Sequence, residues 1–79
     1  MTNLEKYNQA FIDSLEVKES ELEGLAYKVV STWDSVGQMS LIAALEEAFD
    51  IEFMPDDIMA LNSYEAGKQI LENNYDIKF

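Results

Sequence analysis

The apolar residues of this chain recur at intervals of three and four, the spacing that gathers side chains on one face of an α-helix. Residues 35–49 show this most clearly, and good helix formers fill the rest of that run. Residues 2–15 carry a second stripe behind a Thr2 or Asn3 cap, and residues 64–73 carry a third. The predicted core positions are Leu4, Tyr7, Phe11, Leu15, Leu41, Ile42, Leu45, Ala48, Phe49, Ala66, Ile70 and Leu71.

The segments between these helices are interpreted from their turn residues. Pro55 predicts a short helix over residues 55–60, because proline is favoured in the first turn of a helix. Residues 16–34 have weaker periodicity and contain Gly24, so they are expected to form a long ordered loop with one helical turn near 20–23. The apolar residues expected to pack this loop are Leu22, Leu25, Tyr27, Val29 and Trp33.

Three amphipathic helices with one apolar stripe each, and no competing strand pattern, predict an all-α fold. The expected architecture is a small four-helix bundle, with three main helices, a short third helix and a long first loop. The 79 residues are expected to form one domain over 1–79, near the lower size limit for a chain that folds alone. Such a chain has no room for a deep catalytic cleft beside its core.

Charge limits the possible partners. Sixteen acidic residues face five lysines and no arginine, for a net charge of −11. Nucleic acids require a basic footprint and anionic membranes repel an acidic protein, so basic protein surfaces are the expected partners. The N-terminus lacks the basic start and apolar run of a secretory signal, and no apolar run reaches membrane-spanning length. We therefore expect a cytoplasmic protein without membrane insertion, and a monomer, because no long apolar stripe remains outside the core.

The residue types that are absent exclude several kinds of chemistry. Without cysteine there is no disulfide, thiol catalysis or cysteine-based zinc site, and without histidine the usual general base is missing. A hydrolytic role for Ser35 would need such a base, and the acids of the 35–49 helix are expected on a solvated face. Residues 50–57 fail as a calcium loop, because Met and Pro stand where Asp or Asn and then Gly are required. Neither an enzyme nor a metal site is expected.

Asp34 and Ser35 stand directly in front of the 35–49 helix. The residues alone favour a helix cap, in which one of the two side chains accepts a hydrogen bond from a first-turn N–H group. The same position gives Ser35 a second interpretation, because an exposed hydroxyl at a helix N-terminus lies near unpaired N–H donors. A phosphodiester attached there would be stabilised by those donors and the helix dipole, by about 0.3–1 kcal/mol.

Residues 33–53 read WDSVGQMSLIAALEEAFDIEF, which resembles the prosthetic-group region of acyl carrier proteins, where an Asp-Ser-Leu motif opens the second helix. The likeness extends over nearly the whole chain, and in particular to discrete carriers with Trp before the Asp-Ser pair. The resemblance implies that Ser35 carries 4′-phosphopantetheine, attached from coenzyme A by a phosphopantetheinyl transferase, with Asp34 as its motif partner. The thiol of that group would hold an acyl or aminoacyl group as a thioester, which a chain without cysteine cannot do itself.

A second apolar face on the same helix is made by Val36, Met39 and Ala43. The spacing alone allows either a wide core stripe or a docking face. The resemblance favours a docking face, on which Glu46 and Glu47 meet basic residues of partner enzymes and Met39 adapts to their surfaces.

Four positions depart from the family's usual pattern. Val36 stands where Leu is usual, and Thr32 stands where Gly is often found two positions before the Asp. Gly37 and Ser40 stand where other carriers often have acids. Trp33 is expected to anchor the loop by packing.

The resemblance implies a carrier of fatty acid or polyketide biosynthesis that delivers acyl thioesters to partner enzymes and is not itself an enzyme. The implied partners are a phosphopantetheinyl transferase, an acyl- or aminoacyl-loading ligase, and a ketosynthase or acyltransferase with a basic docking surface. Two alternatives stay open. One is an aminoacyl or peptidyl carrier of a specialised pathway, and the other, from a different class, is a non-modified acidic interaction module.

Overall fold

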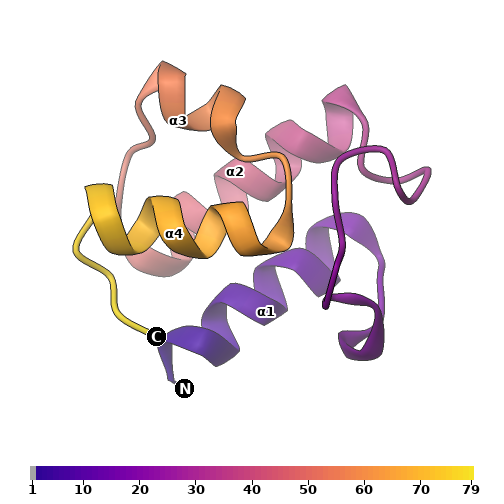
Figure 1. Ribbon diagram of the computed structural model, residues 1–79, viewed down its shortest axis with the longest axis horizontal. Coiled ribbons are helices and arrows are strands. Elements are labelled where there is room, and N and C mark those ends of the chain that lie inside the picture. Colours follow the sequence, from indigo (N-terminus) through magenta and orange to yellow (C-terminus); the bar gives the residue numbers. More distant parts are fainter. Residues whose placement is uncertain (1) are drawn as a thin grey trace.

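The computed structural model describes residues 2–79 and contains four α-helices and one 3-10 turn, η1 (Figure 1). The all-α prediction is confirmed. The second and third helices have the predicted bounds, and the others differ from them by a residue or two. The elements are α1 Asn3–Leu15, η1 Glu19–Glu21, α2 Ser35–Phe49, α3 Pro55–Ala60 and α4 Tyr64–Asn74.

In Figure 1, α4 lies in front of α2, with α1 below it and α3 above. The long connection after α1 closes the right-hand end of the bundle, and both termini lie at the lower left. The termini are tied together there, because the Asn3 side-chain amide donates to the Lys78 carbonyl at 2.9 Å. Within residues 2–79, no helix has both the length and the apolar character that crossing a membrane requires.

The helix starts follow the predicted caps. Thr2 caps α1, since its hydroxyl accepts from the Glu5 N–H at 3.1 Å while the Glu5 carboxylate accepts from the Thr2 N–H. Ser63 caps α4 by accepting from the Ala66 N–H at 3.0 Å. This local chemistry explains why the sequence predicts the helix starts so closely.

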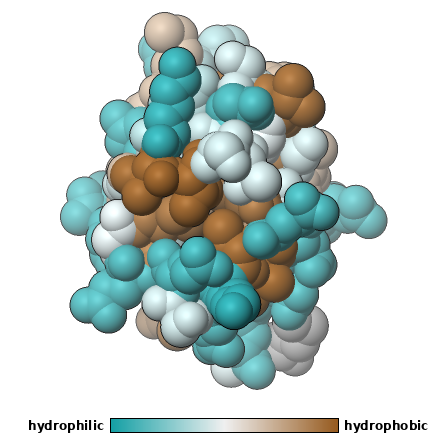
Figure 2. Space-filling model, turned by 90° about the vertical axis from the view of Figure 1, so that its right-hand side faces the viewer, coloured by the Kyte–Doolittle hydropathy of each residue, from teal (hydrophilic) through white to brown (hydrophobic). Residues whose placement is uncertain are grey.

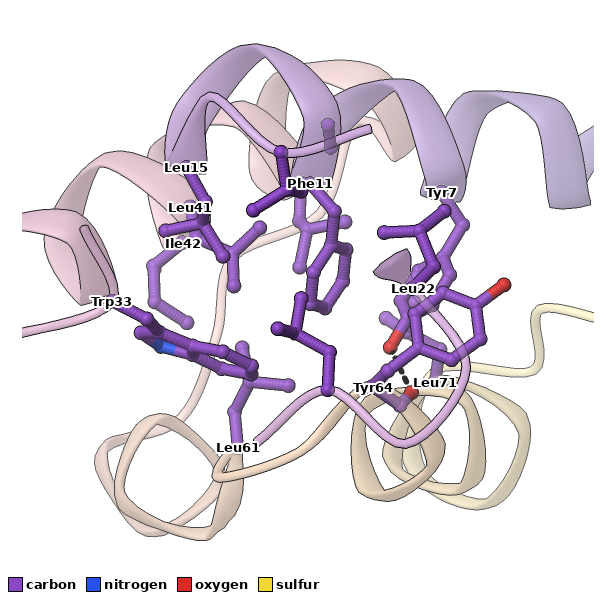
Figure 3. Close-up of a cluster of buried hydrophobic side chains, with 14 of the residues drawn as sticks. Tyr7, Phe11, Leu15, Leu22, Trp33, Leu41, Ile42, Leu61, Tyr64 and Leu71 are labelled. Atoms are coloured by element: carbon purple, nitrogen blue, oxygen red, sulfur yellow. Dashed lines mark hydrogen bonds between the residues drawn. The ribbon is translucent and has the colours of Figure 1, made fainter. Parts of the chain in front are cut away.

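The core is centred on Phe11, whose ring lies 4.8 Å from Tyr7, 5.5 Å from Trp33 and 5.4 Å from Tyr64, measured between ring centroids (Figure 3). Trp33 and Leu22 come from the long connection, so that loop is part of the core, as predicted. The buried apolar side chains are Tyr7, Ala10, Phe11, Leu15, Val17, Leu22, Leu25, Trp33, Leu41, Ile42, Leu45, Phe53, Leu61, Tyr64 and Leu71.

Several core predictions were wrong. Leu4, in the first turn of α1, is 39% exposed. Val29 is 66% exposed, since it lies in a turn closed by its N–H to the Ala26 carbonyl. The predicted core residues that are only partly buried are Ala48, Phe49, Ala66, Ile70 and Tyr27.

The buried tyrosines predict a loss of stability at alkaline pH. Burial is the main cause that raises the pKa of Tyr7 and of Tyr64 above the ordinary value of about 10. The Tyr7 hydroxyl also donates to the Tyr64 carbonyl at 2.5 Å, so the folded state keeps this proton after the unfolded chain has lost it. Stability is therefore fully present below pH 10, and Tyr7 should lower it by about 1.4 kcal/mol for each pH unit above that value, with Tyr64 acting in the same direction.

Urea unfolding midpoints measured from neutral pH to about pH 11 test this. Tyr7→Phe should lower the midpoint at neutral pH, because it leaves the Tyr64 carbonyl without its donor, but should flatten the alkaline decline. Tyr27→Phe is the matched control, since it removes a hydroxyl from a half-buried ring outside this pair. An equally steep decline in Tyr7→Phe would contradict the assignment.

Candidate functional site

The start of α2 is capped by Asp34, whose carboxylate accepts from the Gly37 N–H at 2.9 Å. The Asp34 carbonyl accepts from the Gln38 N–H at 2.8 Å, the first intrahelical bond of α2. Of the two residues that the sequence allowed as a cap, Asp34 has this role and Ser35 is the first residue of the helix.

Ser35 is exposed, and none of the side-chain hydrogen bonds within residues 2–79 involves its hydroxyl. The backbone N–H groups of Ser35 and Val36 likewise have no acceptor in the described chain, as expected for the first turn of a helix. The Ser35 hydroxyl, which has no hydrogen-bond partner in the described chain, therefore lies with two unpaired backbone N–H donors at the positive end of the α2 dipole. This arrangement suits a covalently attached phosphate, and Ser35 needs no activating base of its own if another enzyme performs the attachment.

Trp33 holds the chain just before this site. Its side chain is fully buried, its ring lies edge-on to Phe11, and its backbone N–H donates to the Val30 carbonyl at 3.1 Å. The prediction that Trp33 anchors the loop by packing is confirmed. Because Trp33 is fixed in the core, the two residues that follow it emerge at the surface in a defined place.

Gln38 is a residue of this site that the sequence prediction missed. Its side-chain carbonyl accepts from the Trp33 indole N–H at 2.6 Å, and its amide donates to the carbonyls of Ile58 and Leu61, both at 2.9 Å. It thereby joins α2 to the end of α3. A signal was present, because Gln38 stands three residues before Leu41 on the core stripe, where a polar side chain predicts a buried hydrogen bond.

A surface groove of about 410 Å³ lies beside Ser35, between α2 and α3. Two methionines that are 59% and 83% exposed, Met39 and Met59, supply much of its apolar wall. The groove is lined by Tyr27, Ser35, Gln38, Met39, Ile58, Met59, Leu61 and Asn62. A second depression of about 420 Å³ lies between α1 and α2 and does not include Ser35.

The expected docking residues divide into two groups. Val36, Met39 and Ala43 are all exposed, so the wide-core interpretation of this second face is wrong. Glu47 is also exposed, but Glu46 is half-buried and accepts from the Phe53 N–H at 2.9 Å. The expectation that the acids of this helix all lie on a solvated face therefore fails at Glu46, which also holds the segment after α2.

Gly37 lies on the inner side of α2. A Cβ at this position would collide with the backbone carbonyl oxygen of Thr32 and lie 3.2 Å from the Leu15 Cδ2 atom. No acid can stand here without moving the Thr32 backbone. The departure at Gly37 is therefore a packing requirement of this chain.

Residues 33–66 match the family model for a phosphopantetheine attachment site. Over this segment the chain is similar to phosphopantetheine attachment sites. The matched segment begins at Trp33 and runs through α2 and α3 into α4, so it includes the whole region described above. No solved structure matches the chain.

The match confirms the resemblance to carrier proteins, the predicted cofactor and the carrier role. Domains of this family are non-catalytic and hold 4′-phosphopantetheine covalently, so they interact with a phosphopantetheinyl transferase and with biosynthetic enzymes. The residues of this chain fit that group, because the Ser35 hydroxyl is exposed, unpaired donors lie beside it and a groove adjoins it.

Proposed function

We propose that this protein is an acyl carrier protein whose 4′-phosphopantetheine is attached to Ser35. The observation that carries the proposal is the Ser35 hydroxyl itself, exposed and without a hydrogen-bond partner in the described chain, at the first residue of a capped helix. Attachment forms a bond from Ser35 Oγ to the pantetheine-linked phosphorus of coenzyme A and releases adenosine 3′,5′-bisphosphate. The Ser35 proton passes to a base of the transferase.

Asp34 is proposed to position Ser35 and not to react. Its carboxylate is engaged with the Gly37 N–H, which fixes the first turn of α2 and leaves the N–H groups of Ser35 and Val36 directed at an attached phosphate. When bound, the group supplies a thiol that holds cargo as a thioester.

Intact mass spectrometry tests the carrier proposal. The unmodified protein is incubated with coenzyme A and a promiscuous phosphopantetheinyl transferase, and we expect a gain of one phosphopantetheine per chain. A folded protein that gains no mass would favour the alternative of a non-modified acidic interaction module.

The exposed apolar residues beside Ser35 are proposed to dock partner enzymes. Val36, Met39 and Ala43 form this docking face, with Glu46 and Glu47 at its acidic end. Lys68 and Glu65 on α4 form the one salt bridge within residues 2–79, so no lysine there pairs with an acid of α2, and the exposed Glu47 can meet basic residues of a partner. The residue that the prediction omitted is Met59, which borders the same groove as Met39.

Met39→Glu should lower the kcat/KM of the transferase for this carrier by about tenfold, the effect of losing a central apolar contact. Gln69→Glu on α4 adds the same charge at an exposed position away from the groove and is the matched control. Equal rates for the two variants would remove Met39 from the docking face.

The carrier is proposed to extend beyond the matched segment, as one domain over residues 1–79. Tyr7 and Phe11 of α1 pack directly on Tyr64 and Trp33 of that segment, so the two parts share one core. The further partners proposed are a loading ligase and a ketosynthase or acyltransferase. An aminoacyl or peptidyl cargo in place of a simple acyl group is the alternative within this function.

A further inference from the structure

We propose that the cargo of this carrier stays in the surface groove beside Ser35 and does not enter the helical core, so that the carrier suits short or polar acyl groups, aminoacyl groups included. This inference rests on the proposed function, because it concerns what is attached through Ser35. It names the class of cargo, which the carrier family by itself does not.

The interior next to the site is already filled by Trp33. Its side chain is fully buried, and its ring packs edge-on against Phe11 at 5.5 Å and Tyr27 at 6.3 Å. Figure 3 shows the Trp33 ring between Leu61 on one side and Leu41 and Ile42 of α2 on the other. Because protein interiors are close-packed, an alkyl chain could enter here only if this ring moved.

The route from the groove into the core is closed by Gln38. Its carbonyl accepts from the Trp33 indole N–H, and both hydrogens of its amide are used by the Ile58 and Leu61 carbonyls at the end of α3. Separating α2 from α3 would break the two hydrogen bonds of the Gln38 amide and leave partly buried polar groups unpaired. The Gln38 side chain with its three hydrogen bonds thus forms a polar clamp, which both holds Trp33 in place and joins α2 to the end of α3.

The groove outside this clamp offers a place for a small cargo. Its volume is about 410 Å³, and Met39 and Met59 give it flexible apolar walls. Tyr27 and Asn62 add polar groups to its lining. A short acyl group with a polar substituent can place its carbon atoms against the methionines and its polar atoms near Tyr27 and Asn62. A long alkyl chain would extend beyond the groove into solvent.

Loading with two chain lengths tests the inference. The transferase is supplied with acetyl- or octanoyl-coenzyme A, and intact mass verifies that each acyl-phosphopantetheine is attached. The rate at which neutral hydroxylamine cleaves each thioester is then divided by the rate for the free acyl-coenzyme A. We expect the two ratios to agree within about twofold, and the emission of Trp33, the single tryptophan, to be the same in both forms.

If the ratio for the octanoyl thioester is lower than the ratio for the acetyl thioester by about tenfold or more, the octanoyl group is buried for about nine-tenths of the time. That result would overturn the inference. Failure to load either group would instead contradict the proposed function, so the two failures are distinguishable.

Gln38→Ala removes the clamp and should introduce protection of the octanoyl form that the wild type lacks. If this variant melts cooperatively and still gives equal ratios, Gln38 is not the barrier. If it fails to fold, the wild-type comparison decides the inference alone.

Discussion

Replacing Ser35 by alanine should abolish the attachment of phosphopantetheine completely while leaving the fold intact. The side chain is exposed and makes no hydrogen bond within the described chain, so its loss should change the free energy of unfolding by no more than about 0.5 kcal/mol. Asp34 still caps the helix, because its bond to the Gly37 N–H does not involve the serine. The expected result is a folded protein whose mass does not change on incubation with coenzyme A and transferase.

Ser40→Ala is the matched control, since Ser40 is an exposed serine on the same helix. It should gain one phosphopantetheine at the wild-type rate, and thermal melts of both variants should follow that of the wild type. A mass gain in Ser35→Ala, or its loss in Ser40→Ala, would place the attachment at another residue.

Gly37→Ala should destabilise the protein by about 2–3 kcal/mol, a large cost for one methyl group. The new Cβ would meet the Thr32 carbonyl oxygen, and because this is backbone, no change of rotamer relieves the collision. The Leu15 Cδ2 atom, 3.2 Å away, blocks the other direction. Alanine is intrinsically better than glycine in a helix, so a destabilised variant would show that packing outweighs propensity here.

The same substitution should also slow phosphopantetheine attachment. Thr32 lies directly before Trp33 and the Asp34 cap, so a shift of its backbone displaces the turn that presents Ser35. Urea unfolding gives the stability, and the rate of mass gain under conditions where the variant is folded gives the second effect. Ser40→Ala again serves as the control, and a Gly37→Ala variant as stable as this control would contradict the packing argument.

The positions of the helices were predictable because they depend on neighbours in sequence. The capping box at Thr2, the caps at Asp34 and Ser63, and Pro55 at the start of α3 each act within one turn. Such signals need no knowledge of the tertiary structure. The carrier role was likewise readable, because the residues that carry it are contiguous from Trp33 onward.

The side-chain partners across the bundle were not predictable in this way. Gln38 bonds to carbonyls twenty or more residues away, and Glu46 reaches the Phe53 N–H across the turn after α2. Tyr64 was missed as a core residue, although its ring packs on both Tyr7 and Phe11. These contacts depend on how the helices cross and on where the chain returns after each turn.

The sequence by itself determined the helices, their starts, the acidic charge and the motif that presents Ser35, since each depends on local chemistry or composition. Only the tertiary structure decided that Val36 and Met39 face solvent, and that Gly37 must remain glycine. It also decided that Trp33 and Gln38 close the core beside the site. The physical reason is close packing, because the environment of a side chain is set by segments that lie far from it along the chain.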